Sequence, residues 1–85
     1  MSLPLQPVTL TPEQIGDLDR KLAVMRHNVN NSLAMLVATA EIMRRKPESA
    51  IRFANSFTEQ PQKIAEEIKQ FSELLQTTLR MNQEG

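Results

Sequence analysis

The residues best suited to chemistry lie in one short segment, RHNVNNSLAML, at residues 26–36. It holds the only histidine of the chain, His27, followed by Asn28, Asn30 and Asn31. An imidazole is largely neutral near pH 7, and its free ring nitrogen is then a nucleophile. Asparagine favours caps and turns over helix interiors, because its amide competes for backbone hydrogen bonds. The segment therefore raises the question of how a polar cluster around one imidazole is positioned.

Composition excludes several other kinds of site. The chain has no cysteine and a single histidine, so disulfides are absent and a transition-metal site is not expected. Its two glycines, Gly16 and Gly85, cannot form the closely spaced glycine loop that cradles phosphates, so we expect no ATP site. A net charge of zero and three phenylalanines argue against a nucleic-acid surface. We expect the chain itself to bind no cofactor.

Nothing in the sequence predicts contact with a membrane. No apolar run approaches the roughly 20 residues that a spanning helix needs. The first ten residues, MSLPLQPVTL, lack the basic and then apolar pattern of a secretory signal. The expected location is the cytoplasm.

Two long helices account for most of the chain. Residues 1–10 contain two prolines and predict an extended arm. Thr11, Pro12 and Gln14 form a helix start with a capping box, and Pro47 stops that helix, which predicts helices over about 12–46 and 48–82 and a tail at 83–85. Pro61 lies inside the second helix, so a kink there or a break followed by a new start are both open.

Apolar residues recur at spacings of three and four along both helices, the pattern of amphipathic helices in a bundle. The stripe of the first helix consists of Ile15, Leu18, Leu22, Met25, Val29, Leu33, Leu36, Ala40 and Met43. Two helices of equal length joined by a tight turn predict an antiparallel hairpin. Because a lone hairpin leaves half of each stripe wet, the sequence predicts an all-α homodimer, in which two hairpins form a four-helix bundle.

The same periodicity predicts that His27 faces away from the apolar stripe. Asn31 and Ala34 follow one and two turns later on this outer face, and Ala38 continues it with Thr39 beside them. Small residues beside an exposed imidazole would allow another protein to approach closely.

Residues 27–33, His-Asn-Val-Asn-Asn-Ser-Leu, resemble the H-box of the dimerisation and phosphotransfer domain of histidine kinases. The resemblance implies a hairpin that dimerises into a four-helix bundle, with His27 as the phosphoacceptor. It implies that Asn31 hydrogen-bonds the phosphoryl group or a water, and that a receiver-domain partner docks over Ala34, Ala38 and Glu41. The receiver domain would supply the Mg²⁺ ion.

Two positions depart from that family's pattern. Asn28 stands where the family has an acidic residue, and an amide cannot act as a base. Ser32 stands where a proline is usual. Folding the hairpin about Pro47 predicts that Glu66 and Glu67 lie roughly opposite His27, where one of them could replace the missing carboxylate.

Three functions remain open from the sequence. The first is a histidine phosphotransfer protein of a two-component system or phosphorelay, which would be at most a phosphotransferase and not an ATP-dependent kinase. The second is an inactive relative that serves as a helical adaptor for a signalling protein. The third is a purely structural coiled-coil hairpin.

Overall fold

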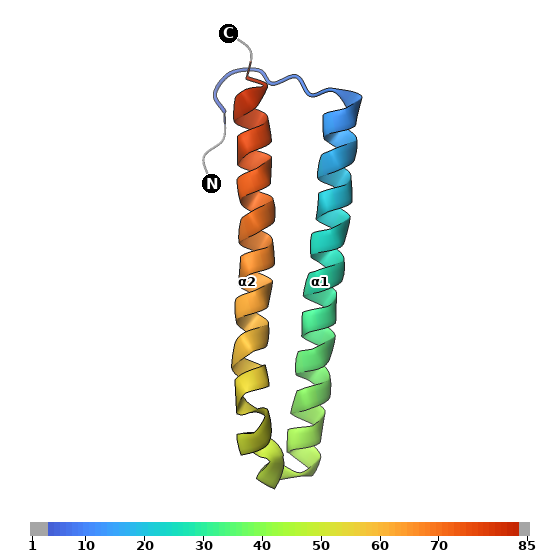
Figure 1. Cartoon of the computed structure of the whole chain (residues 1–85), viewed down its shortest axis with the longest axis vertical. Helices are drawn as coiled ribbons and strands as arrows, with labels where there is room; N and C mark the ends of the chain where they lie inside the picture. Colours follow the sequence, from blue (N-terminus) through green and yellow to red (C-terminus); the bar gives the residue numbers. More distant parts are fainter. Residues whose placement is uncertain (1–3, 84–85) are drawn as a thin grey trace.

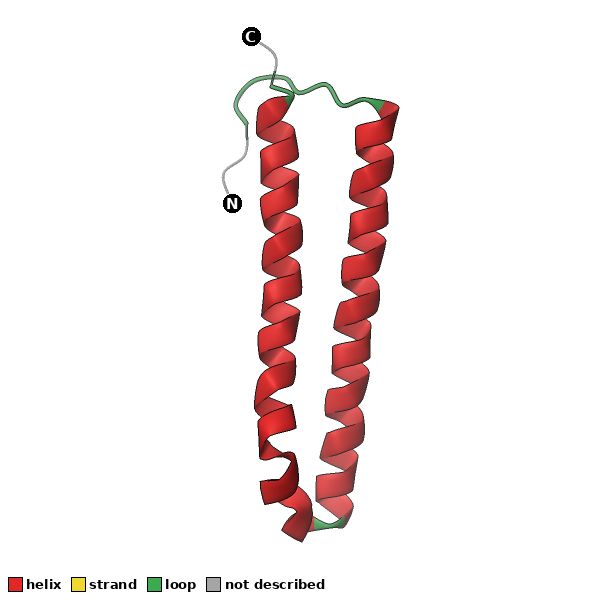
Figure 2. Ribbon diagram, in the orientation of Figure 1, coloured by secondary structure: helices red, strands yellow, loops and turns green. Residues whose placement is uncertain are grey.

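The chain folds into two long antiparallel helices that lie side by side (Figure 1). The structure is a computed structural model that describes residues 4–83. Helix α1 spans Pro12–Arg45, a short 3₁₀ helix η1 spans Pro47–Ser49, and α2 spans Ala50–Met81. The molecule measures 61 × 22 × 13 Å. The predicted helical hairpin is confirmed, and Figure 2 shows no strand among the described residues.

Helix α1 begins at the predicted capping box. The hydroxyl of Thr11 accepts a hydrogen bond from the backbone N–H of Gln14 at 3.1 Å, and the Gln14 side chain accepts one from the backbone N–H of Thr11 at 2.9 Å. Both donors belong to the group of backbone N–H bonds that a helix start leaves unpaired. Arg44 and Arg45 occupy the last turn, where cations are favoured by the helix dipole.

The turn between the helices is formed by three residues. Ser49 closes it, because its backbone N–H and its hydroxyl both donate to the carbonyl of Lys46, at 2.9 and 2.7 Å. Helix α2 then runs through Pro61 without interruption, so the alternative of a break before Pro61 is wrong.

An extended segment ties the open end of the hairpin together. The described part of the arm, from residue 4, crosses from the start of α1 towards the end of α2 (Figure 1). Thr9 donates its backbone N–H to the carbonyl of Asn82 at 3.3 Å, and Val8 and Gln83 form an isolated antiparallel bridge. The described part of the predicted arm is therefore held against the residues that directly follow α2. Residues 1–3 and 84–85 of the predicted arm and tail lie outside the described residues.

The seam between the helices differs from the predicted stripe in its second half. Leu33 and Ala40 were expected at the seam, yet both are exposed. Ser32 is half-buried, and Thr39, which was expected beside the outer face, is buried. Ile15, at the start of the predicted stripe, is also 54% exposed. The seam continues the seven-residue repeat from Leu18 through Met25 to Ser32 and Thr39, as expected of helices that supercoil gently around each other.

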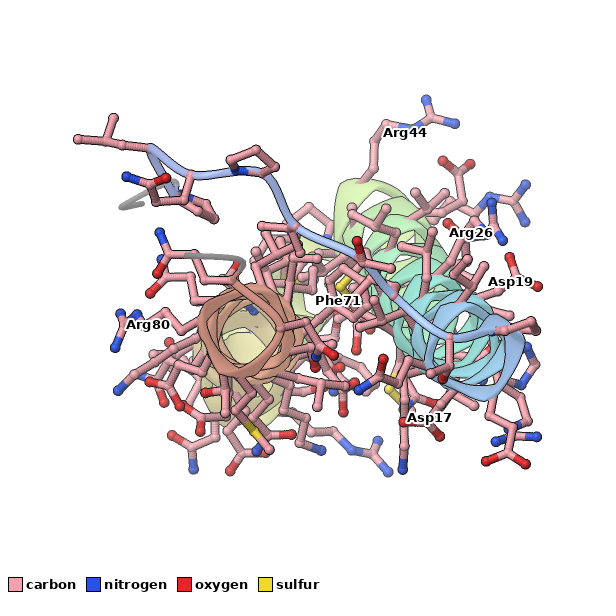
Figure 3. All side chains as sticks on the ribbon, turned by 90° about the horizontal axis from the view of Figure 1, so that it is seen from above. Asp17, Asp19, Arg26, Arg44, Phe71 and Arg80 are labelled. Carbon is pink, nitrogen blue, oxygen red and sulfur yellow. The ribbon has the colours of Figure 1, made fainter. Side chains whose placement is uncertain are left out.

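The hairpin has two different sides. Helical periodicity puts Arg26 and Leu33 on one side of the seam and Asp17, Val24 and Asn28 on the other. Seen along the helices, Arg26 and Asp17 project to opposite sides (Figure 3). We call the first side the apolar face, since the side chains of both helices that border the seam there are largely apolar. It consists of Ile15, Leu22, Val29, Leu33 and Leu36 of α1 and Ile64, Ile68, Leu75 and Leu79 of α2.

No apolar side chain of the described residues is fully buried. The two buried residues in this part of the chain are polar, Thr39 and Gln60. Gln60 donates its side-chain amide to the sulfur of Met35 at 3.1 Å. A single hairpin of this composition therefore leaves its apolar face in contact with water.

Replacing Pro61 with alanine is expected to stabilise the protein. The substitution restores a backbone N–H inside α2, and proline in a helix interior costs about 3 kcal/mol relative to alanine. We expect the free energy of unfolding to rise by roughly 1–3 kcal/mol, measured by urea unfolding at one fixed protein concentration. The neighbouring exposed substitution Gln62→Ala is the control and should change stability by less than about 0.5 kcal/mol. An unchanged free energy of unfolding in Pro61→Ala would show that the missing backbone hydrogen bond does not cost stability at this position.

Candidate functional site

His27 lies near the midpoint of α1 and is exposed, as its predicted position on the outer face requires. Its Nε2 atom lies 3.2 Å from the amide nitrogen of Asn31, one helical turn further on. Because an amide nitrogen only donates hydrogen bonds, this geometry fits the tautomer with the proton on Nδ1 and the lone pair on Nε2. The structure therefore pairs the two residues that the sequence analysis singled out as phosphoacceptor and amide partner.

The side chain of Asn28 lies on a different side of α1 from that of His27. Its side chain is half-buried and lines a groove between the helices, on the side opposite the apolar face. Asn30 and Asn31 are exposed. The helix tolerates these three asparagines because none of them is enclosed in a core.

The three predicted docking residues lie in two environments. Ala34 and Ala38 are exposed on α1 and leave its outer surface smooth beyond His27. Glu41 is held by two arginines, since Nε of Arg44 and Nε of Arg45 both donate to its carboxylate at 3.2 Å. The hydrogen bond from Arg44 is the main cause that lowers the pKa of Glu41 and raises the pKa of Arg44.

The Glu41 cluster predicts a small dependence of stability on pH. The pKa of Glu41 in the fold is below its ordinary value of 4.5, so its contribution is complete above that value. The contribution is lost as the pH falls through the lowered pKa, because the protonated carboxyl loses its attraction to the arginines. We therefore expect Glu41→Gln to lower the urea midpoint at pH 7 and to have little effect at pH 2–3.

Glu48→Gln is the matched control, because Glu48 is exposed and forms no ion pair among the described residues. Its urea midpoint should follow that of the wild type at both pH values. An equal loss in Glu41→Gln at pH 7 and at pH 2–3 would show that Glu41 acts by packing and not by its charge.

The two glutamates expected opposite His27 form no hydrogen bond or ion pair with it. Glu66 is exposed and accepts a hydrogen bond from Gln70 at 3.3 Å, while Glu67 lines the groove together with Asn28. Within residues 4–83, the one hydrogen-bond partner of His27 is Asn31. No hydrogen bond in the fold supports the idea that a glutamate of the second helix replaces the missing acidic neighbour of His27, and it stays a prediction.

The groove itself was not predicted from the sequence. It has a volume of about 360 Å³ and lies between the middle of α1 and the facing part of α2. Phe71, one of its lining residues, projects between the two helices in Figure 3. The lining residues are Lys21, Val24, Met25, Asn28, Glu67, Gln70, Phe71 and Leu74. The signal for the groove in the sequence is the apolar Val24, which lies outside the predicted stripe on the side of α1 that carries Asn28.

Metal ligands do not gather in the described part of the chain, which contains no group of three or more histidine, cysteine or acidic residues able to hold an ion. Over the same residues, neither helix is long and apolar enough to cross a membrane. The hydrogen-bonded His27–Asn31 pair and the groove lined by the next residue, Asn28, make up the candidate site.

Fold and site together define an all-α helical hairpin with one exposed, hydrogen-bonded histidine on its first helix. No family model, curated protein or solved structure matches the chain.

Proposed function

We propose that this protein is a histidine phosphotransfer protein, which accepts a phosphoryl group from a receiver-domain aspartate on His27 and passes it to another. The observation that carries the proposal is the exposed imidazole whose Nε2 is hydrogen-bonded by Asn31. The resemblance of residues 27–33 to a histidine-kinase H-box supports it. The exposed Ala34 and Ala38 beside His27 give a receiver domain room to approach.

The chemistry requires little from this chain beyond positioning. The lone pair on Nε2 attacks the phosphorus of the aspartyl phosphate, so that a P–N bond forms and the P–O bond to the aspartate breaks. The aspartate leaves as a carboxylate with the electron pair, while Nδ1 keeps its proton. Asn31 turns its amide from Nε2 to a phosphoryl oxygen. The receiver domain supplies the Mg²⁺ that neutralises the transferred group.

The active form in this proposal is a homodimer. The apolar face of one hairpin covers the apolar face of a second, which gives a four-helix bundle and removes both from water. His27 lies away from that face and stays accessible in the dimer. Receiver domains are cytoplasmic signalling modules, so the protein acts in the cytoplasm.

One observation favours a second candidate, a helical adaptor that binds a signalling protein without chemistry. Asn28 replaces the acidic residue of the H-box, and its side chain lines the groove instead of flanking the imidazole. An adaptor would bind the receiver domain equally well with or without a histidine at position 27.

Transfer of radiolabel tests the proposal. Receiver domains encoded near this chain's gene are phosphorylated with radiolabelled acetyl phosphate, separated from it, and mixed with the protein and Mg²⁺. We expect label on this chain that is labile in acid and stable in base, as a phosphohistidine is. Absence of such label from every receiver domain that binds the chain would exclude phosphotransfer and favour the adaptor.

A further inference from the structure

The buried side chain of Gln60 has an unusual hydrogen-bond partner. Gln60 is 5% exposed, and its amide nitrogen donates to the sulfur of Met35 at 3.1 Å. Within residues 4–83 this amide donates to no oxygen atom. Buried amides normally donate to an oxygen of the protein or of water, and a thioether sulfur is only a weak acceptor. The buried donor is therefore only weakly satisfied.

Met35 is accessible to reagents in water, because it is 53% exposed. It follows Asn28 by seven residues, so helical periodicity places it on the groove side of α1, opposite the apolar face. A dimer formed through the apolar face leaves Met35 exposed. Its sulfur has two lone pairs, and the hydrogen bond from Gln60 occupies one of them. The other lone pair is available to an oxidant.

The other methionines of the described chain lie in different surroundings. Met25 and Met43 are half-buried, and Met81 is 76% exposed. None of these three accepts a hydrogen bond from a described residue. Oxidation turns the apolar thioether into a polar sulfoxide, which disrupts packing where the side chain is covered. At Met35 the same change takes place at a half-exposed position beside a buried donor, so its effect on stability should have the opposite sign.

We propose that Met35 is an oxidation site whose sulfoxide is held by Gln60, so that its oxidation stabilises the hairpin. The oxidant is a hydroperoxide, with hydrogen peroxide as the simplest case. The free lone pair of the sulfur attacks one peroxide oxygen, and the S–O bond forms as the O–O bond breaks. The displaced hydroxide takes the proton of the transferred hydroxyl group and leaves as water. The sulfur loses two electrons, and the peroxide gains them.

The product fits the contact better than the thioether does. The rotatable bonds of methionine let the sulfoxide oxygen turn towards the Gln60 amide, and this oxygen carries more negative charge than the sulfur did. Because Met35 is half-exposed, the new polar group also keeps part of its hydration. The contact joins α1 to α2 one residue before Pro61, where α2 lacks a backbone donor. Oxidation therefore strengthens the link between the helices at that point.

A chain in which Met35 is the one methionine of residues 4–83 tests the proposal. The substitutions Met25→Leu, Met43→Leu and Met81→Leu produce it, and leucine is close to methionine in volume. The folded chain is treated with hydrogen peroxide, and peptide mass spectrometry measures the oxygen gained at Met35. We expect the equilibrium constant for unfolding in urea, at one fixed protein concentration, to fall by about threefold on oxidation. Adding Met35→Leu gives the blank, in which peroxide should leave the unfolding unchanged.

Gln60→Leu in the same chain assigns the effect to the hydrogen bond. Without the amide donor, oxidation of Met35 should no longer stabilise the fold. Comparing the oxidised and reduced forms of one variant cancels any effect of the substitution itself. Gln62→Leu is the matched control, because Gln62 is exposed and lies two residues further along α2. It should keep the threefold stabilisation.

The side-chain amide of Gln60 reports on the contact in the wild-type chain, whether or not the leucine variants fold. We expect its proton resonances to move downfield and its exchange with water to slow on oxidation, because the acceptor becomes stronger. Unmoved Gln60 resonances would overturn the proposal. A urea midpoint that falls or stays constant on oxidation, or one that rises equally in Gln60→Leu, would overturn it as well. So would a folded chain in which Met81 takes up oxygen and Met35 does not.

Discussion

Replacing His27 with glutamine is expected to abolish phosphoryl uptake, with a loss of at least about 1,000-fold in the label gained from a receiver domain. The imidazole is the proposed phosphoacceptor, and a glutamine amide cannot form a stable bond to phosphorus. Glutamine also keeps a hydrogen-bonding group within reach of Asn31. Because His27 is exposed, its replacement should change the free energy of unfolding by no more than about 0.5 kcal/mol.

Arg26→Gln provides the matched control for this experiment. It introduces the same residue at the adjacent exposed position and removes a charge without touching the imidazole. We expect this variant to take up label at nearly the wild-type rate. Residual acid-labile label on His27→Gln would mean that another residue accepts the phosphoryl group. Equal receiver binding by wild type and His27→Gln, with no label on either, would favour the adaptor.

The ends of the helices could be predicted because they depend on local chemistry. Thr11 and Gln14 form their capping box within one turn, and Pro47 ends α1 whatever packs against it. The hydrogen bond between His27 and Asn31 was predictable for the same reason, since residues four apart on a helix always lie on one face.

The seam and the groove could not be read in the same way, because they depend on how one helix is rotated against the other. Leu33 is apolar and follows Val29 by four residues, so the apolar pattern predicts Leu33 at the seam and not Ser32. In the structure the polar residues Ser32 and Thr39 lie at the seam, and Leu33 lies on the apolar face. In a two-helix hairpin an apolar residue can lie at the seam or on either of the two sides that flank it, and its side depends on how the helices are rotated.

Glu67 illustrates the same limit at the candidate site. The length of the hairpin was enough to predict that Glu67 lies at the level of His27, and it was not enough to predict which side it occupies. The carboxylate lines the groove with Asn28, on the inner side of α1, whereas the imidazole is on the outer side. The number of residues between the turn and a given residue sets its position along the helix axis. Its neighbours depend on how the two helices are rotated when they pack.

No apolar side chain among residues 4–83 is fully buried, so the proposed dimer interface would add burial that the single hairpin lacks. Two helices alone form a single layer, and each apolar residue beside the seam is covered from one direction only. The apolar face runs from Ile15 to Leu36 on α1 and from Ile64 to Leu79 on α2, over most of the length of the hairpin. A second copy can cover it with the same residues, as twofold symmetry requires.

Introducing a charge into the apolar face is therefore expected to separate the proposed dimer into single hairpins. In a twofold dimer Leu33→Glu loses two buried leucines, each of which contributes about 1.5–3 kcal/mol, and it also desolvates two carboxylates. We expect the dissociation constant of the dimer to rise by at least about 100-fold, and the thermal midpoint to fall with it at low concentration. Sedimentation equilibrium over a range of concentrations measures the first, and circular dichroism the second.

Ile42→Glu is the matched control for this prediction. Leu33 and Ile42 are 46% and 42% exposed in the single hairpin, but Ile42 lies on the groove side of α1. Because the two exposures are similar, the cost of placing a charge in the single hairpin should be similar, and a difference between the variants reports on the apolar face. A dimer lost equally in both variants would mean that the charge disturbs the hairpin itself. A wild-type chain that stays monomeric and fully helical at high concentration would refute the four-helix bundle, since its apolar face would then be stable in water.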